Sequence, residues 1–219
     1  ISSERQKTKL FIKNKVDFSN NVKFNKKFSK ITAENFIKDN IYKKINPKLL
    51  AVSDNFKFGR NRKGDIKLLK KYSGKFNYKL LNIRPYKYFE KVVSSTEIRN
   101  YLMKGKINLA NKLLSRTWFI DGVVRRGKKL GRKLGYRTCN IYIENYVLPK
   151  IGIYAVRVSI NNENKRFGGV AYLGSRPTFN EKKVFLEVNI FGLKKNLYKK
   201  KLRVYFLKYL RGDKKFNNS

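Results

Sequence analysis

The second half of the chain alternates apolar and polar residues with the period of two that is typical of β-strands. Two apolar strand faces stand out: Tyr154, Val156, Val158 and Ile160 in one segment, and Leu186, Val188 and Ile190 in another. Further strands are predicted at 167–173 and 202–210. The alternation places Glu187 on the face opposite its apolar neighbours. Antiparallel strands at this spacing predict a small closed barrel.

The first half mixes helical and strand patterns. Thr32 has the hydroxyl of an N-cap for a helix that runs to about Ile41. The short apolar run at 49–53 is typical of a buried parallel strand. Other segments are predicted as helices at 3–14 and 65–73, as a strand at 78–83 and as a broken strand at 16–24. Strands that alternate with helices predict an α/β layer.

A sharper helix signal lies in the middle of the chain. Ser94 and Glu97 have the spacing of a capping box, so a helix begins there. Its free amides, together with nearby hydroxyls and Arg99, could face an anion, although capping alone is the commoner meaning of such a box. A second short amphipathic helix follows Gly105.

The charge balance brings a different function class into consideration. The 219 residues contain 54 Lys+Arg against 14 Asp+Glu, a formal net charge of +40, which is typical of a nucleic-acid binder. The lysines are spread along the chain and accompany many asparagines, isoleucines and tyrosines. We therefore favour a codon bias as their origin over a dedicated nucleic-acid function, and we keep a basic nucleic-acid-binding module as the alternative.

Composition also limits compartment and chemistry. Cys139 is the only cysteine, so an intramolecular disulfide is excluded and a reducing, cytoplasmic location is expected. We find neither an apolar run long enough for a membrane span nor the apolar core of a signal peptide. The first residue is Ile rather than Met, which suggests a fragment. The absence of histidine excludes an imidazole base or ligand in the chain as given.

One constellation of residues is suited to phosphoryl transfer. Glycines let a loop approach phosphate closely, neutral side-chain oxygens suit Mg²⁺, and a carboxylate can act as base toward a hydroxyl nucleophile. These groups are supplied in order by Gly122, Gly127, Gly131, Thr138, Asn140 and Glu187. Glycine loops are common and no Walker-type Gly-Lys-Ser/Thr occurs, so the specificity of the pattern is moderate. Gly122 and Gly127 as hairpin glycines, and Glu187 as a solvated strand residue, are the alternatives.

The stretch Gly131-Arg132-Lys133-Leu134-Gly135-Tyr136-Arg137-Thr138-Cys139-Asn140 resembles the riboflavin kinase signature Gly-Arg-x-Leu-Gly-Phe-Pro-Thr-Ala-Asn. Downstream, Gly152-Ile153-Tyr154, Gly169-Val170-Ala171-Tyr172, Leu186-Glu187-Val188 and Tyr209-Leu210-Arg211 follow in the family's order and spacing. The resemblance implies a six-stranded riboflavin kinase barrel at 116–219. Two departures from the signature matter, Arg137 in place of Pro and Cys139 in place of Ala, and Arg137 removes a fixed φ before Thr138.

The resemblance implies that the γ-phosphoryl group of ATP is transferred to riboflavin, giving FMN. Glu187 would be the catalytic base, Thr138 and Asn140 would hold Mg²⁺, and Arg211 would lie on the flavin side. The ATP phosphates would be bound by Gly122, Gly127, Gly131, Arg132, Thr138 and Asn140. An inactive flavin-binding remnant, suggested by Arg137, is a further alternative.

Residues 1–115 resemble part of the FMN adenylyltransferase domain, a Rossmann-like nucleotidyltransferase, of the bacterial bifunctional enzymes that also make FAD. Asp54, Asn55 and Phe56 fall in a Gly-x-Asp-Phe-x-Phe-Gly-like segment, in which Ser53 replaces the glycine and Asn55 the aspartate. A basic loop that simply closes a strand is about as good an interpretation of this segment. The run Ser94, Ser95, Thr96 and Arg99 resembles the Ser-Ser-Thr-x-Ile-Arg motif that holds ATP phosphates. The family's Gly-x-Phe-Asp-Gly-x-His-x-Gly-His stretch and its terminal helix are absent, so we expect an incomplete domain and no adenylyl transfer.

Overall fold

A computed structural model of the chain describes residues 1–126, 137–143, 146–161, 163–177, 182–193 and 195–213. The chain divides into two compact units. One combines residues 1–14 with residues 93–219, and the other consists of residues 15–92.

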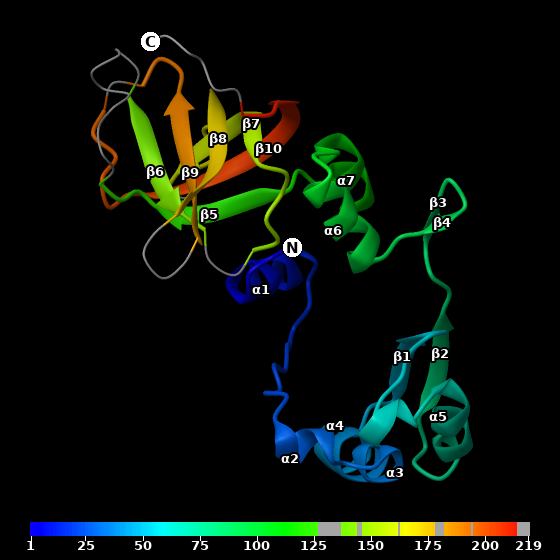
Figure 1. Cartoon of the computed structure of the whole chain (residues 1–219). Helices are drawn as coiled ribbons and strands as arrows, with labels where there is room; N and C mark the ends of the chain where they lie inside the picture. Colours follow the sequence, from blue (N-terminus) through cyan, green and yellow to red (C-terminus); the bar gives the residue numbers. More distant parts are fainter. Residues whose placement is uncertain (127–136, 144–145, 162, 178–181, 194, 214–219) are drawn as a thin grey trace. The chain divides into compact units, whose positions relative to one another are not determined.

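The first unit contains a six-stranded antiparallel sheet (Figure 1). Its strands are β5 (Phe119–Val123), β6 (Thr138–Tyr142), β7 (Gly152–Ile160), β8 (Phe167–Pro177), β9 (Lys182–Ile190) and β10 (Lys201–Arg211). They pair in the order β5-β10-β7-β8-β9-β6. Just beyond β5, an antiparallel bridge from Arg125 to Asn140 of β6 joins the two ends of this order. The sheet is thus a nearly closed barrel, which confirms the predicted fold of this half.

The barrel is filled by the apolar faces that the alternating pattern predicted. Trp118, Tyr154 and Phe206 are the largest fully buried side chains, and both Trp118 and Tyr154 pack on Phe206, with ring centroids 4.8 and 5.0 Å apart. Each buried aromatic or aliphatic side chain of this kind contributes about 1.5–3 kcal/mol. Because inward and outward residues alternate, the polar positions of the same strands face outward.

Two helices precede the barrel and extend its core. Ser94 caps α6 (Ser95–Met103), as its Oγ accepts a hydrogen bond from the Glu97 amide at 3.2 Å, which confirms the predicted start. Gly105, with φ of +72°, then turns the chain into α7 (Ile107–Leu113), because this left-handed conformation favours glycine. The apolar faces of both helices join the barrel core through Ile98, Leu102, Ile107 and Ala110.

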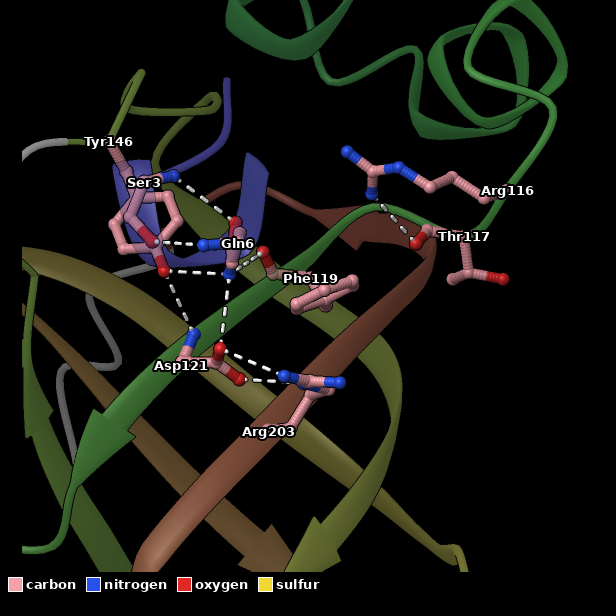
Figure 2. A network of polar contacts seen from close by, with 8 residues as sticks. All are labelled: Ser3, Gln6, Arg116, Thr117, Phe119, Asp121, Tyr146 and Arg203. Carbon is pink, nitrogen blue, oxygen red and sulfur yellow. Dashed lines mark hydrogen bonds and ion pairs between the residues drawn. The ribbon is translucent and has the colours of Figure 1, made fainter. Parts of the chain in front are cut away.

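The first helix of the chain, α1 (Glu4–Lys13), belongs to the same unit and is held by polar contacts (Figure 2). Gln6 is only 2% exposed, and its Nε2 donates to the Tyr146 hydroxyl at 2.8 Å. The Trp118 indole donates to the Ile1 carbonyl at 2.8 Å. Ser3 caps the helix in a reciprocal capping box with Gln6. The predicted helix at 3–14 is confirmed, and its single buried polar side chain is satisfied.

The second unit is built on a βαβ arrangement. Strands β1 (Leu49–Ser53) and β2 (Lys79–Ile83) pair in parallel and α5 (Ile66–Ser73) connects them, capped by Asp65. The unit also contains α2 (Lys26–Ser29), α3 (Ala33–Asn35), the π-helix η1 (Phe36–Tyr42), α4 (Lys43–Ile45), the 3₁₀ turn η2 (Arg60–Arg62), β3 (Lys87–Tyr88) and β4 (Lys91–Val92). Its own core includes Ile37, Val52, Phe58, Leu69 and Tyr78. The predicted α/β layer is confirmed in this part of the chain.

One predicted element of the second unit is wrong. Residues 16–24 were expected to form a broken strand because Val16, Phe18, Val22 and Phe24 are spaced by even numbers, but the structure has no regular element there. Phe18 is 93% exposed and Phe24 78% exposed. A strand needs a neighbour for its backbone hydrogen bonds, and among the described residues no strand pairs with this segment.

None of the helices in the described parts of the chain combines the length and the apolar character that crossing a membrane requires.

Candidate active site

The pairing of β6 with β9 brings the predicted base beside a predicted magnesium ligand. Asn140 lies directly opposite Glu187, and Thr138 lies opposite Asn189. Residues paired in this way share one face of the sheet, with Cβ atoms about 4.5–5.5 Å apart. Leu186 and Val188, on either side of Glu187, are fully buried. The four polar residues therefore form one patch on the outer face of the barrel.

The same row continues across the neighbouring strands. Tyr172 of β8 pairs with Glu187, Ile153 of β7 pairs with Tyr172, and Arg211 of β10 pairs with Ile153. Arg211 is thus three strand spacings from Glu187, roughly 14 Å along the sheet. The structure places the predicted flavin-side arginine and the predicted base in one lateral row, with an aromatic residue between them.

Sequence reasoning did not single out Tyr172, which belongs to this row, or Asp213, which contacts it. The Tyr172 hydroxyl donates to Asp213 Oδ2 at 2.9 Å, across 41 residues of sequence. This contact brings a second carboxylate to the face that carries Glu187. The signal that could have found Tyr172 is its position opposite Glu187, and that position depends on the strand register rather than on the alternating pattern.

Asn189 was also missed, and it acts on the turn that precedes Thr138. Its Nδ2 donates to the Arg137 carbonyl at 3.0 Å. Arg137 stands where the riboflavin kinase signature has proline, so a restriction on φ is absent at this residue. The hydrogen bond from Asn189 holds the backbone at the point where proline would have stiffened it.

The backbone of Asn140 is fixed from two sides. Asn140 pairs with Glu187 on β9, and the Asn140 carbonyl accepts a hydrogen bond from the Arg125 amide at 2.9 Å. Asn140 therefore lies where the barrel closes, and its side chain is presented by backbone that is paired on both sides.

The donor set can be tested against a magnesium ion. Within the parts of the chain that the structure describes, there is no group of three or more His, Cys, Asp or Glu side chains that could hold a metal. Mg²⁺ commonly binds through one or two protein oxygens together with substrate phosphates and waters. The hydroxyl of Thr138 and the amide of Asn140 beside the Glu187 carboxylate fit that mode of binding, in which phosphate supplies most of the ligand charge.

Cys139 lies between the two predicted metal ligands but faces the other way. Its side chain packs against the barrel core. Burial raises the pKa of the thiol to about 11. The thiol is therefore protonated at neutral pH, whereas metal ligation and nucleophilic attack both need the thiolate.

The predicted phosphate loop is only partly described. Gly122 lies within β5, where a Cβ atom would come within 2.0 Å of Ile141 Cγ2, so the absence of a side chain lets β5 and β6 approach closely. Gly127, Gly131 and Arg132 lie outside the described residues. A role for all four in phosphate binding remains a prediction.

The residues predicted to contact nucleotide in the first half fall into both units. Asp54, Asn55 and Phe56 follow β1 at the carboxyl end of the parallel pair, the usual ligand edge of such sheets. Asp54 accepts a hydrogen bond from Asn82, and Phe56 stacks on Phe58 with ring centroids 5.5 Å apart. These contacts tie the turn to its own unit.

The second predicted nucleotide segment begins α6 in the barrel-containing unit. Ser94 is used as the N-cap, while Ser95, Thr96 and Arg99 are exposed in the first two turns. Their role in anion binding remains a prediction, because the cap already accounts for Ser94.

Comparison with known families matches two parts of the chain. Residues 114–219 match the riboflavin kinase family, and residues 1–97 match the FAD synthetase family. A solved structure with a TM-score of 0.88 and 27% identity, described as a macrolide-efflux protein from Streptococcus pneumoniae, covers 99% of this chain and 69% of that one. This similarity bears on the fold, and the efflux activity in that name belongs to that protein.

Curated relatives are named for two activities in a single chain. A bifunctional riboflavin kinase/FMN adenylyltransferase of Buchnera aphidicola subsp. Schizaphis graminum is 40% identical over 202 residues, which cover 91% of this chain and 64% of the relative. The proteins of that name from Haemophilus influenzae and Escherichia coli K12 are 35% and 34% identical, and in each case the match covers 97% of this chain, with 68% and 67% of the relative. The chain thus spans about two thirds of the length of these relatives, and just under two thirds of the first. Together with the barrel and the patch of polar residues on β6 and β9, these similarities show that the chain belongs to the family of bifunctional riboflavin kinase/FMN adenylyltransferases.

Proposed function

We propose that the barrel is a riboflavin kinase, which transfers the γ-phosphoryl group of ATP to the terminal ribityl hydroxyl of riboflavin and yields FMN and ADP. The observation that carries this proposal is the pairing of Asn140 with Glu187 on the outer face of β6 and β9. It brings a side-chain amide oxygen beside a carboxylate, and these are the kinds of group that can serve as metal ligand and base in phosphoryl transfer to a hydroxyl.

Each group has one task in the transfer. Glu187 takes the proton of the ribityl hydroxyl while the hydroxyl oxygen forms a bond to the γ-phosphorus. At the same time, the bond between that phosphorus and the oxygen that bridges it to ADP breaks, and ADP leaves. Thr138 and Asn140 would hold Mg²⁺ and the phosphates, and the bound metal would supply positive charge to the phosphate oxygens. Gly122, Gly127, Gly131 and Arg132 bind the phosphates of ATP.

The flavin lies along the row from Glu187 to Arg211. The spacing of roughly 14 Å between these residues along the sheet matches the scale of a ring system with an extended ribityl chain. Tyr172 lies between them and offers an aromatic surface, held by its hydrogen bond to Asp213. We place the ribityl end at Glu187 and the ring end toward Arg211.

Residues 116–219 then form the kinase domain and residues 1–115 the adenylyltransferase part. Asp54, Asn55, Phe56, Ser94, Ser95, Thr96 and Arg99 are its nucleotide contacts in this proposal. The 219 residues contain no histidine, so we propose that they do not transfer an adenylyl group to FMN by themselves. Cys139 is the single cysteine, so the 219 residues form no intramolecular disulfide, which supports a cytoplasmic location.

The test is the formation of FMN from riboflavin, ATP and Mg²⁺, followed by liquid chromatography with fluorescence detection. Glu187→Gln keeps the size of the side chain and removes the base, so kcat should fall about 10²- to 10⁴-fold with little change in stability. The matched control is Glu163→Gln, which alters an exposed acid in the turn after β7 and should leave kcat unchanged.

Equal turnover in the parent and in Glu187→Gln would remove Glu187 from the mechanism. Absence of FMN from the folded parent would overturn the kinase proposal. FAD in the same chromatograms would contradict the proposed lack of adenylyl transfer.

A further inference from the structure

A cavity of about 430 Å³ lies on the outer face of β5 and β10, beside α1. It shares no residue with the patch on β6 and β9. Five cationic side chains line it: Lys9, Lys13, Arg116, Arg166 and Arg203. Its volume is within the range of about 300–1,000 Å³ that is typical of small-molecule sites.

Each arginine of this cavity lies over an aromatic ring, and Figure 2 shows two of them, Arg116 and Arg203, with the ring of Phe119. Arg203 lies over the ring of Phe119 at 4.2 Å, and Arg116 lies over the same ring at 5.4 Å. Arg166 lies over the ring of Tyr205 at 4.2 Å. A guanidinium stacked on a ring keeps its N–H groups in its own plane, where they can donate to a phosphate.

The positive charge in the cavity is only partly compensated. Asp121 binds Arg203 through two hydrogen bonds of 2.7 and 3.0 Å. Among the described residues that line the cavity, there is no Asp or Glu. Burial, and then the nearby charge of Arg203, lower the pKa of Arg116. The charged guanidinium is therefore less stable there than in water, and a bound anion would stabilise it.

Codon bias does not account for this arrangement. A bias toward lysine codons adds lysines over the whole surface, and lysines far outnumber arginines in this chain. The cavity instead gathers three arginines from three separate segments, and each is placed over an aromatic ring. Arginine is the side chain best suited to binding phosphate with two donors at once.

We propose that this cavity is a second, non-catalytic binding site for a small anion that carries a diphosphate group. Such a group occurs in inorganic pyrophosphate and in nucleoside diphosphates. The shared chemistry is a compact charge of two to three units that several fixed donors can contact simultaneously. Phe119, Tyr205 and Leu10 add apolar surface to the lining, which suits an attached base or other ring.

Calorimetric titration of the full chain with inorganic pyrophosphate and, separately, with ADP tests the proposal. The cavity variant is Lys9→Gln/Arg166→Gln, and the control is Lys7→Gln/Lys165→Gln. Both remove two positive charges from the same two segments and alter exposed side chains, but Lys7 and Lys165 do not line the cavity. Circular dichroism verifies that both are folded.

We expect the cavity variant to bind pyrophosphate at least 10-fold more weakly than the parent, and the control variant to bind it as the parent does. A loss for ADP but not for pyrophosphate would assign the site to the nucleoside diphosphate. Equal affinity in the two variants for both probes would overturn the proposal, because the binding would then follow net charge alone.

A short single-stranded RNA serves as the competing macromolecule. If RNA binding falls in the cavity variant while neither small anion binds the parent, the cavity is part of a nucleic-acid surface and the proposal is wrong. FMN formation by the cavity variant should equal that of the parent. Binding is measured without turnover, so the proposal can fail or hold whether or not the kinase activity is found.

Discussion

Cys139 couples the stability of the barrel to pH. Burial raises its pKa from an ordinary value of 9.0 to about 11 in the folded chain. Between these two values the unfolded chain has lost the thiol proton and the folded chain still holds it, so the folded state loses stability as pH rises from 9 to 11. Below pH 9 the thiol is protonated in both states and the effect vanishes.

The change to make is Cys139→Ala, and the measurement is the free energy of unfolding in urea at several pH values. The parent should lose about 2 kcal/mol more than the variant between pH 9 and pH 11. The difference between the two proteins isolates the thiol from the many lysines and tyrosines that titrate in the same range. Identical pH profiles would contradict the proposed burial.

At the scale of single elements, the contact between β5 and β6 depends on Gly122. A Cβ atom there would meet Ile141 Cγ2 at 2.0 Å, and Ile141 is fully buried, so neither side can move away freely. Gly122→Ala should therefore destabilise the barrel by about 1–3 kcal/mol. Gly168→Ala is the matched control, because its nearest neighbour would be Phe191 Cδ2 at 3.5 Å, an ordinary contact.

A double-mutant cycle shows whether the clash is the cause. Ile141→Ala alone leaves a cavity, and in the double variant the new methyl group at 122 gains the space that Ile141 vacates. The two changes should be less harmful together than the sum of their separate effects, by about 0.5–3 kcal/mol in thermal or urea unfolding. Strict additivity would mean that Gly122 is needed for another reason, such as the predicted phosphate loop.

The alternating pattern located the barrel strands but could not pair them. It placed Glu187 on the outer face correctly, because the side-chain period of a strand is two. Asn140 and Tyr172 lie beside Glu187 because of the strand register. Register depends on turn geometry and core packing, which the alternating pattern does not contain. Tyr172 and Asp213 were missed for that reason. The same pattern wrongly predicted a strand near Phe18, where the apolar residues have no sheet to join.

Local signals in the sequence were more reliable at helix ends. Thr32 and Ser94 were predicted as N-caps and both accept the expected backbone hydrogen bond, from Asn35 and Glu97 respectively. Capping depends on residues three apart, so it can be seen without knowledge of the fold. The π-helical continuation after Asn35 was not predicted, because its backbone geometry is set by packing.

At the scale of the whole molecule, the two units have separate cores and should respond separately to core substitutions. Leu69 is fully buried in the core of residues 15–92, and Leu202 is fully buried in the barrel. Replacement of a buried leucine by alanine costs about 2–5 kcal/mol. Leu69→Ala should destabilise the first of these cores, and Leu202→Ala the second.

Hydrogen exchange measured by mass spectrometry distinguishes the two responses. In Leu69→Ala, amides of residues 15–92 should exchange faster while those of the barrel strands keep their rates, and FMN formation should persist. In Leu202→Ala the barrel strands should exchange faster instead. Faster exchange throughout the chain in either variant would show that the units unfold as one.

The contacts of α1 determine when this helix can dock during synthesis of the chain. Gln6 cannot make its hydrogen bond until Tyr146, 140 residues later, has been synthesised. The contact of Ile1 likewise requires Trp118. At about 5–20 residues per second, α1 is exposed for roughly 7–28 s before Tyr146 has been made. Residues 15–92 contain their own core and can fold during that interval, so α1 is made before this unit but docks after it.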